Sequence, residues 1–338
     1  MTIDDVKDLS IQIDSFKLTS GDESGDFEVA CCLWGDVTKP LVVLLGGISA
    51  DRTALNRSSQ QQAGWWSQVF NDDSYLNTQT HSFLTFEYFA FSSRLTNPPL
   101  VSTHDQAHVL QCIQKAIHLP QFHAVIGASY GGMVALAFAT QYPDKLNNLV
   151  CIAAADYSTV KSQALRQIQR NIIELGDRYA TDSLSHKQFV SLARCLAMVG
   201  YRGEYEWEQR FQNAQPGAAL NAVASYLKYN GDSFAERFLA SRYFQLSKSI
   251  DYHQVDVQGI QVKTLLIGIT SDQMVPVEML EQMQQKFKKP CKIELIDSIY
   301  GHDGFLLEAE QLNHNFKSFF SEFTHDYFKP NDCCASRH

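Results

Sequence analysis

The chain lacks the features that mark secreted, membrane-spanning and zinc-binding proteins. Its N-terminus has neither a basic region nor an apolar stretch, so we expect no signal peptide. The longest apolar runs, near Leu41–Leu45 and Val150–Ala155, are too short to cross a bilayer. None of the eight cysteines forms a Cys-x-x-Cys pair, which argues against a zinc site or a disulfide framework. We therefore predict a cytoplasmic protein with reduced thiols and no bound metal.

Clusters of basic residues are also missing. The 338 residues carry 37 acidic and 28 basic side chains, which gives a net charge of -9, and no run of lysine or arginine stands out. This distribution argues against nucleic acid and anionic membranes as partners. With 45% hydrophobic residues, the chain is long enough for one large domain, or for a domain that carries an insertion. We expect small-molecule substrates and a homodimer.

One short segment, residues 127–132, directs the interpretation of the rest, and its sequence is Gly-Ala-Ser-Tyr-Gly-Gly. The apolar run Phe122–Ile126 precedes it, and a helical pattern of small residues at 133–139 follows it. A strand, Gly-x-Ser-x-Gly and a helix form the nucleophile elbow of α/β-hydrolases, where glycines relieve the crowding of a strained turn. The pattern predicts that Ser129 is a nucleophile at the carboxyl end of a sheet. The alternative is an ordinary glycine-rich turn.

The apolar patterns predict an α/β-hydrolase fold, a mostly parallel central sheet with helices on both faces. We expect a hairpin over residues 10–34 and strands at 41–45, 83–91, 122–126, 149–153, 264–268 and 291–296. Helices are expected at about 105–117 and 305–323 and, with no strands between them, at 163–175, 186–198, 204–213 and 220–229. We interpret 1–155 and 251–330 as the hydrolase core, 156–250 as an inserted helical lid, and 331–338 as a disordered tail.

Two further catalytic groups are expected at the ends of later strands. In this fold the acid and then the base follow the nucleophile along the chain. Asp272 comes just after the predicted strand 264–268, and His302 stands between glycines after the predicted strand 291–296. Capping of a helix is the alternative role of Asp272, and His253 is the rival base.

The strand at 41–45 ends in two glycines, Gly46 and Gly47. Glycines at this point let the backbone turn and present N–H groups to the substrate, as in the oxyanion hole of this fold. We predict that the N–H groups of Ile48 and Tyr130 form that oxyanion hole. The alternative is a tight turn with no role in binding.

Together these residues resemble the homoserine O-acyltransferase family of α/β-hydrolase enzymes, over roughly residues 10–323. Residues 301–308, Gly-His-Asp-Gly-Phe-Leu-Leu-Glu, are similar to the family's His-Asp-x-Phe-Leu-x-Glu signature, and patterns within 223–253 are similar to its lid. Residues 46–52, Gly-Gly-Ile-Ser-Ala-Asp-Arg, resemble the branch associated with succinyl transfer. Many members have a Leu-Gly-Gly loop after the fourth strand, where this chain has Phe89–Thr96.

The resemblance implies an acyl-CoA-dependent, two-step reaction in methionine biosynthesis. The acyl group, succinyl in preference to acetyl, passes to Ser129 and then to the side-chain hydroxyl of L-homoserine. The resemblance implies no bound cofactor, because acyl-CoA is a co-substrate. The alternatives are a serine O-acyltransferase of the same family, an esterase or thioesterase, and a non-catalytic binding protein. The complete set of Ser129, Asp272 and His302 argues against the last.

The family match also suggests the residues that bind the acceptor. Homoserine carries an α-carboxylate, which suits arginine, and an α-ammonium group, which suits a carboxylate. The match places these roles at four residues: Arg170, Tyr201, Arg202 and Asp303. Salt bridges within the lid are the alternative role of the two arginines, and capping of the loop is that of Asp303.

Overall fold

The computed structural model describes residues 6–57, 63–91, 98–212 and 216–321. Among these residues, eight strands form one sheet in the order β1-β2-β4-β3-β5-β6-β7-β8. The strands are β1 (Val6–Ile13), β2 (Phe27–Trp34), β3 (Leu41–Leu45), β4 (Ser82–Phe86), β5 (Ala124–Ala128), β6 (Asn148–Ile152), β7 (Lys263–Ile269) and β8 (Cys291–Ile296). β2 pairs antiparallel with β1 on one side and with β4 on the other. From β4 to β8 in the order of the sheet, every neighbouring pair is parallel. The predicted fold class and the N-terminal hairpin are confirmed.

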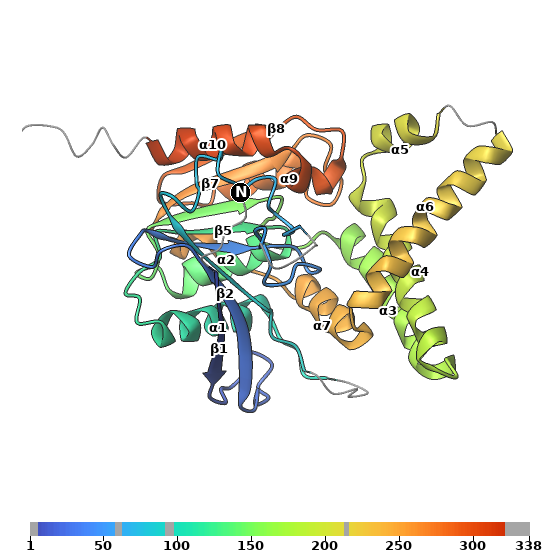
Figure 1. Ribbon diagram of the computed structural model, residues 1–338, viewed down its shortest axis with the longest axis horizontal. Helices are drawn as coiled ribbons and strands as arrows, with labels where there is room; N and C mark the ends of the chain where they lie inside the picture. Colours follow the sequence, from blue (N-terminus) through green and yellow to red (C-terminus); the bar gives the residue numbers. More distant parts are fainter. Residues whose placement is uncertain (1–5, 58–62, 92–97, 213–215, 322–338) are drawn as a thin grey trace, which may run out of the picture.

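Helices cover both faces of the sheet (Figure 1). On one face lie α1 (Thr103–Ala116), α2 (Tyr130–Gln141) and α8 (Val277–Gln284), and on the other lies α10 (Ala309–Ser321). Within β3, Leu41, Val43 and Leu45 belong to the core on the α1 and α2 side, whereas Val42 and Leu44 belong to the opposite core. Successive strand residues point to opposite faces, so a strand buried on both sides reads as a continuous apolar run.

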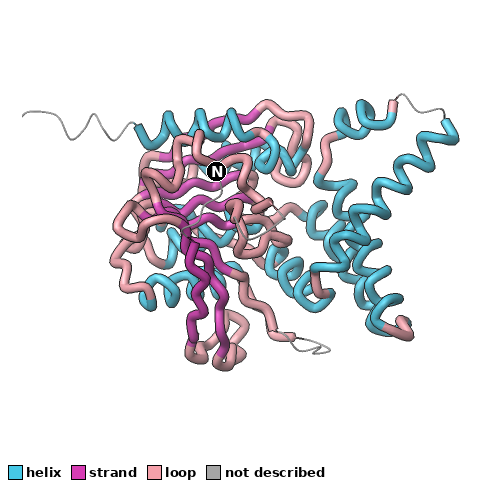
Figure 2. Tube along the Cα trace, viewed as in Figure 1, coloured by secondary structure: helices cyan, strands magenta, loops and turns pink. Residues whose placement is uncertain are grey.

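A group of helices lies between β6 and β7 in the chain and to one side of the sheet in space (Figure 2). It comprises α3 (Val160–Tyr179), α4 (Ser183–Tyr201), α5 (Glu204–Phe211), α6 (Pro216–Arg237) and α7 (Ala240–Asp251). We call these helices the helical segment. The first four correspond to predicted helices, and α7 was not predicted individually. No helix in the described ranges is long and apolar enough to span a membrane.

β4 is shorter than predicted, because it ends at Phe86 rather than at residue 91. Two glutamine side chains replace the sheet hydrogen bonds that a longer strand would make. Gln106 accepts from the Phe89 N–H at 2.9 Å and donates to its carbonyl at 2.7 Å, and Gln245 holds Phe91 in the same way. Such long-range contacts leave no periodic signal in the sequence. The rest of the unusual stretch 89–96, from residue 92 on, lies outside the described residues.

The last predicted helix, 305–323, is divided in the structure. α9 (Gly304–Leu307) is a single turn that ends at Glu308, whose φ of -92° and ψ of 56° interrupt the helix before α10 begins. The interruption at Glu308 lets η2 (Gly301–Asp303) lie at the edge of the sheet while α10 packs against one face of the sheet. The predicted tail 331–338 lies outside the described residues.

Candidate active site

Ser129 lies in the turn between β5 and α2, where the sequence predicts it. Its φ of 55° and ψ of -120° are rarely adopted by residues other than glycine, and such a conformation costs about 1–3 kcal/mol. The Ser129 N–H donates to the Ile152 carbonyl at 2.9 Å, and the Gly131 N–H donates to the Gly46 carbonyl at 2.9 Å. The ends of β6 and β3 therefore hold the turn from both sides.

Two glycines permit the close approach that this turn requires. A Cβ on Gly127 would lie 2.1 Å from the Gly131 carbonyl oxygen, and a Cβ on Gly131 would lie 2.2 Å from the Leu45 carbonyl oxygen. Both contacts involve backbone atoms, which cannot move aside without displacing the start of α2 or the end of β3. The glycines of Gly-x-Ser-x-Gly are thus explained by close packing within the elbow and between the elbow and β3.

Three side chains from separate strand ends form a hydrogen-bonded chain. Ser129 follows β5, Asp272 follows β7 and His302 follows β8, and these parallel strands end at the same edge of the sheet. His302 Nε2 lies 2.7 Å from Ser129 Oγ, and His302 Nδ1 lies 2.6 Å from Asp272 Oδ2. This arrangement lets His302 take the proton of Ser129 while Asp272 holds the ring in the required tautomer.

Two backbone N–H groups hold the Asp272 carboxylate so that one of its oxygens can accept a hydrogen bond from the His302 ring. Its Oδ1 accepts the N–H groups of Met274 at 2.7 Å and Val275 at 3.0 Å, which leaves Oδ2 for the His302 ring. Burial lowers the pKa of His302, but the charge of Asp272 and its hydrogen bond outweigh burial. The pKa of His302 is therefore raised above its ordinary value of 6.5.

Backbone contacts fix the loop that carries His302. Gly301 has a φ of 62°, and a Cβ there would lie 2.5 Å from the Gly203 nitrogen between α4 and α5. The Gly301 N–H donates to Ser271 Oγ at 2.9 Å, beside Asp272. The Trp66 indole N–H donates to the Phe305 carbonyl at 2.9 Å. The base is thus held by the helical segment, by the loop after β7 and by the core.

The two predicted oxyanion-hole residues both border Ser129. Ile48 and Tyr130 line the same cavity as Ser129. Since Tyr130 is the first residue of α2, its N–H has no acceptor within the helix. The Ile48 N–H donates to no backbone or side-chain acceptor among the described residues. Both N–H groups are thus available to a ligand beside Ser129.

His253, the rival base, has a different environment. It is 3% exposed, its Nδ1 lies 2.7 Å from Thr103 Oγ1, and its Nε2 lies 3.1 Å from the Ala155 carbonyl oxygen. Burial lowers its pKa to about 3. It does not line the cavity that contains Ser129. These contacts describe a neutral histidine that links α1 to the end of β6.

A cavity of about 350 Å³ lies over Ser129 and His302. The sheet edge forms its floor, with Gly47, Ile48 and Val275, and the helical segment forms its opposite wall. Four arginines line it, namely Arg166, Arg194, Arg202 and Arg237, and one aspartate, Asp303. A reactive serine under a cavity with several arginines can accept an acyl group from a donor and hold an anionic second substrate.

Comparison with known proteins identifies the family. A family model for the alpha/beta hydrolase fold matches residues 40–309. The chain belongs to the α/β-hydrolase fold family. It is 28% identical over 285 residues to a homoserine O-succinyltransferase from Xanthomonas campestris pv. campestris, with 83% of this chain and 75% of that one covered.

Two solved structures show how widely this α/β-hydrolase fold is shared. Homoserine O-acetyltransferase from Staphylococcus aureus matches with a TM-score of 0.80 and 23% identity, covering 97% of this chain and 98% of that one. Esterase E22 matches with a TM-score of 0.81 and 16% identity, covering 93% and 99%. The same fold thus supports acyl transfer and ester hydrolysis, and the residues around the cavity must distinguish them.

Three of the four predicted acceptor-binding residues of this α/β-hydrolase line the cavity. The Tyr201 ring centroid lies 5.9 Å from that of His302. Arg202 Nη1 lies 2.9 Å from Glu206 Oε1, and its Nε lies 3.2 Å from Asp303 Oδ2, an ion pair without hydrogen-bond geometry. Because two carboxylates already compensate the charge of Arg202, we do not expect it to bind the acceptor carboxylate.

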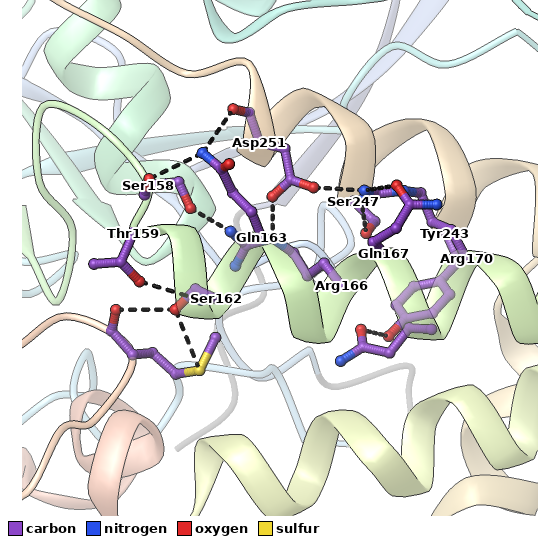
Figure 3. Close-up of polar contacts among 12 residues, drawn as sticks. Ser158, Thr159, Ser162, Gln163, Arg166, Gln167, Arg170, Tyr243, Ser247 and Asp251 are labelled. Atoms are coloured by element: carbon purple, nitrogen blue, oxygen red, sulfur yellow. Dashed lines mark hydrogen bonds and ion pairs between the residues drawn. The ribbon is translucent and has the colours of Figure 1, made fainter.

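Arg170 does not line the cavity, which corrects the expectation that it binds the acceptor. Its guanidinium is buried, with Nη2 2.6 Å from Asp251 Oδ2 and Nη1 3.0 Å from Ser247 Oγ. Arg166, one turn earlier on α3, binds the other oxygen of Asp251 at 2.6 Å (Figure 3). The two arginines share one carboxylate and join α3 to α7, and only Arg166 borders the cavity.

Arg194 lines the cavity, although the sequence did not single it out. It has no carboxylate partner among the described residues, and its guanidinium lies 5.4 Å from the centre of the Tyr201 ring and 4.8 Å from that of Phe234. A signal was available, because Arg194 and Tyr201 are seven residues apart and therefore share one face of α4. Arg194 thus packs against two aromatic rings, one of which, Tyr201, lies beside His302.

Proposed function

We propose that this α/β-hydrolase transfers an acyl group from acyl-CoA to the side-chain hydroxyl of L-homoserine, with succinyl as the favoured group, in methionine biosynthesis. One observation carries the proposal. Ser129 and His302, which are linked by hydrogen bonds to each other and to Asp272, line a cavity that Arg194 and Asp303 also line. An amino-acid zwitterion matches this pair of charges, and its side-chain hydroxyl then points toward Ser129.

In the first half-reaction, Ser129 takes the acyl group. His302 Nε2 removes the Ser129 hydroxyl proton while Oγ attacks the thioester carbonyl carbon. The N–H groups of Ile48 and Tyr130 stabilise the oxyanion of the tetrahedral intermediate. When the intermediate collapses, the carbon–sulfur bond breaks and His302 gives its proton to the departing CoA thiolate. The products are CoA and an ester on Ser129.

In the second half-reaction, homoserine replaces CoA in the cavity. His302 removes the proton of the homoserine hydroxyl, whose oxygen attacks the ester carbonyl on Ser129. The tetrahedral intermediate collapses with cleavage of the bond to Ser129 Oγ, which recovers its proton from His302. The helical segment forms the wall opposite Ser129, and we propose that it acts as a lid that limits water and favours transfer over hydrolysis.

The charges around the cavity support the proposed orientation of the acceptor. Asp251 compensates Arg166, whereas Arg194 has no carboxylate partner among the described residues and is available for the α-carboxylate. Asp303 lines the same cavity as Ser129 and contacts Arg202 through Oδ2, which leaves Oδ1 as an acceptor. We propose that this oxygen accepts from the α-ammonium group. Tyr201 lies between Arg194 and His302 and forms the side of the acceptor site.

A matrix of donors and acceptors tests the proposed function. Succinyl-CoA and acetyl-CoA are each incubated with homoserine, with serine and with no acceptor, and thiol release and product mass are followed. We expect thiol release to be fastest with succinyl-CoA and homoserine, and the product to have the mass of O-succinylhomoserine. Equal release without an acceptor would indicate an esterase or thioesterase, and faster release with serine would indicate a serine O-acyltransferase. Either result would refute the proposal.

The assignment of Arg194 predicts a selective defect. Arg194→Lys is expected to slow discharge of acylated Ser129 by homoserine about 10- to 100-fold, because lysine cannot form two parallel hydrogen bonds to a carboxylate. Acylation by acyl-CoA should change less than threefold. Rapid mixing separates the two steps. Arg178→Lys is the control, because Arg178 is exposed on α3 and lies away from the cavity. Slower acylation with normal discharge would place Arg194 in the donor site instead.

A further inference from the structure

One face of α6 lines the cavity with polar groups that acceptor binding does not use. Asn230, Ser233, Phe234 and Arg237 all border the cavity. Their spacing of three, one and three residues places them on the same side of a helix. The other residues of this helix include Asp232 and Glu236, which form ion pairs with Lys228 and Lys187. Both carboxylates are therefore paired with lysines, and neither forms an ion pair with Arg237.

Arg237 is a second cavity arginine without a carboxylate partner among the described residues. Its one hydrogen bond is from Nε to the Ser233 carbonyl, at 3.4 Å and within its own helix. Arg166 and Arg202 are compensated by carboxylates, so the uncompensated positive charge of the cavity comes from Arg194 and Arg237. A guanidinium in a cavity wall is well suited to bind a carboxylate or a phosphate.

The two uncompensated arginines come from different helices and differ in exposure. Arg194 on α4 is half-buried and contacts the Tyr201 ring, which itself lies beside His302, whereas Arg237 on α6 is exposed. An amino-acid acceptor has one carboxylate, which Arg194 takes next to the base. Arg237 is left for an anionic group on the other substrate, the acyl donor.

We propose that Arg237, with Ser233 and Asn230 beside it, binds the distal carboxylate of a dicarboxylic acyl group such as succinyl. The inference rests on the proposed function, since it assumes acylation of Ser129. Arg237 lines the same cavity as Ser129, and an acyl group bonded to Ser129 lies in that cavity in both half-reactions, whereas CoA leaves after the first. The phosphates of CoA are the competing anions, and the choice of donors below distinguishes them from the acyl carboxylate. Arg237 thus selects the acyl group and not the carrier.

The test compares four donors in the wild type and in Arg237→Gln. They are succinyl-CoA, butyryl-CoA, and the succinyl and butyryl thioesters of N-acetylcysteamine. Butyryl has the same carbon chain with a methyl group in place of the carboxylate, and N-acetylcysteamine carries no phosphate. The readout is kcat/KM for thiol release in the presence of saturating homoserine, which discharges Ser129 after each acylation, and the product is identified by its mass. Arg178→Gln is the control on the outer surface of the same helical segment.

We expect Arg237→Gln to lower kcat/KM about 10- to 100-fold for both succinyl donors and less than twofold for both butyryl donors. Arg237→Lys should recover part of the loss, because it restores the charge but not the paired hydrogen bonds. Three results would overturn the proposal. An equal loss of kcat/KM for both CoA donors, with no loss for the N-acetylcysteamine donors, would indicate a phosphate site. An equal loss of kcat/KM for all four donors, or no loss for any of them, would show that Arg237 does not recognise the acyl carboxylate. The butyryl donors also report folding of the variant.

The same experiment separates this inference from the proposed function. If the wild type transfers no acyl group from any donor to homoserine, the proposed function fails whatever the effect of Arg237→Gln. If transfer to homoserine occurs and the ratio of succinyl to butyryl rates is unchanged in Arg237→Gln, the acceptor assignment stands and the donor subsite is refuted.

Discussion

Replacement of Ser129 by alanine is expected to lower kcat/KM for acyl transfer by about 10⁵-fold. The reason is geometric, because Ser129 Oγ lies 2.7 Å from His302 Nε2 and no other hydroxyl in the described ranges contacts this nitrogen. Without Ser129 Oγ the covalent intermediate cannot form, and the oxyanion hole and cavity retain only weak catalysis. Steady-state thiol release with succinyl-CoA and homoserine measures the loss.

Ser49→Ala provides a matched control for the Ser129 variant. Ser49 lines the same cavity and lies next to Ile48, but it makes no contact with the base. We expect its removal to change kcat/KM less than fivefold. A loss at Ser49 as large as at Ser129, or near-normal activity in Ser129→Ala, would show that the nucleophile has been assigned to the wrong residue.

The second large effect is expected at the base and the residue that orients it. His302→Ala should be as damaging as Ser129→Ala, because the two groups act as one unit. Asp272→Asn should cost about 10⁴-fold. An asparagine can keep its oxygen toward the N–H groups of Met274 and Val275, but its amide then faces His302 Nδ1 and favours the wrong tautomer. The kcat/KM values of the two variants, measured with the same substrates, test this order.

The pH profile gives the Asp272 variant a readout that loss of structure would not produce. Acylation needs a neutral His302, and the Asp272 carboxylate raises the pKa of that histidine above 6.5. In the wild type, kcat/KM should therefore rise with pH through a pKa above 6.5. Asp272→Asn removes the cause of the increase, so the acidic limb of its residual activity should move to lower pH. An unchanged limb would contradict the assignment of the titrating group to this pair.

The arrangement of Ser129, Asp272 and His302 could be predicted because it depends on the order of strands and turns. Buried parallel strands read as continuous apolar runs, and Ser129 and Asp272 follow such runs at β5 and β7. His302 follows β8, whose residues alternate between polar and apolar because this strand lies at the edge of the sheet. Since the carboxyl ends of parallel strands meet at one edge, strand order alone brings these residues together. The glycines around Ser129 add a local signal, because the turn they permit is strained.

The residues that line the cavity from the helical segment could not be predicted as well, because they depend on which way each helix faces. Arg166 and Arg170 are one turn apart on α3, and both bind Asp251, yet only Arg166 borders the cavity. The spacing of apolar residues predicts the helix but does not show which flank of its polar face meets the sheet edge. The early end of β4 also could not be predicted. The segment after it is held by Gln106 and Gln245, which bind Phe89 and Phe91 and are far from them in the sequence.

The central claim, a Ser129 acyl-enzyme that homoserine discharges, is tested most directly by intact-mass spectrometry of the wild type. The enzyme is mixed with succinyl-CoA alone, analysed, and then mixed with homoserine or with buffer. We predict one succinyl group per chain, located on Ser129 by peptide mapping, that homoserine removes much faster than buffer while O-succinylhomoserine forms. A succinyl group on another residue, or discharge at the same rate in buffer to give free succinate, would contradict the claim.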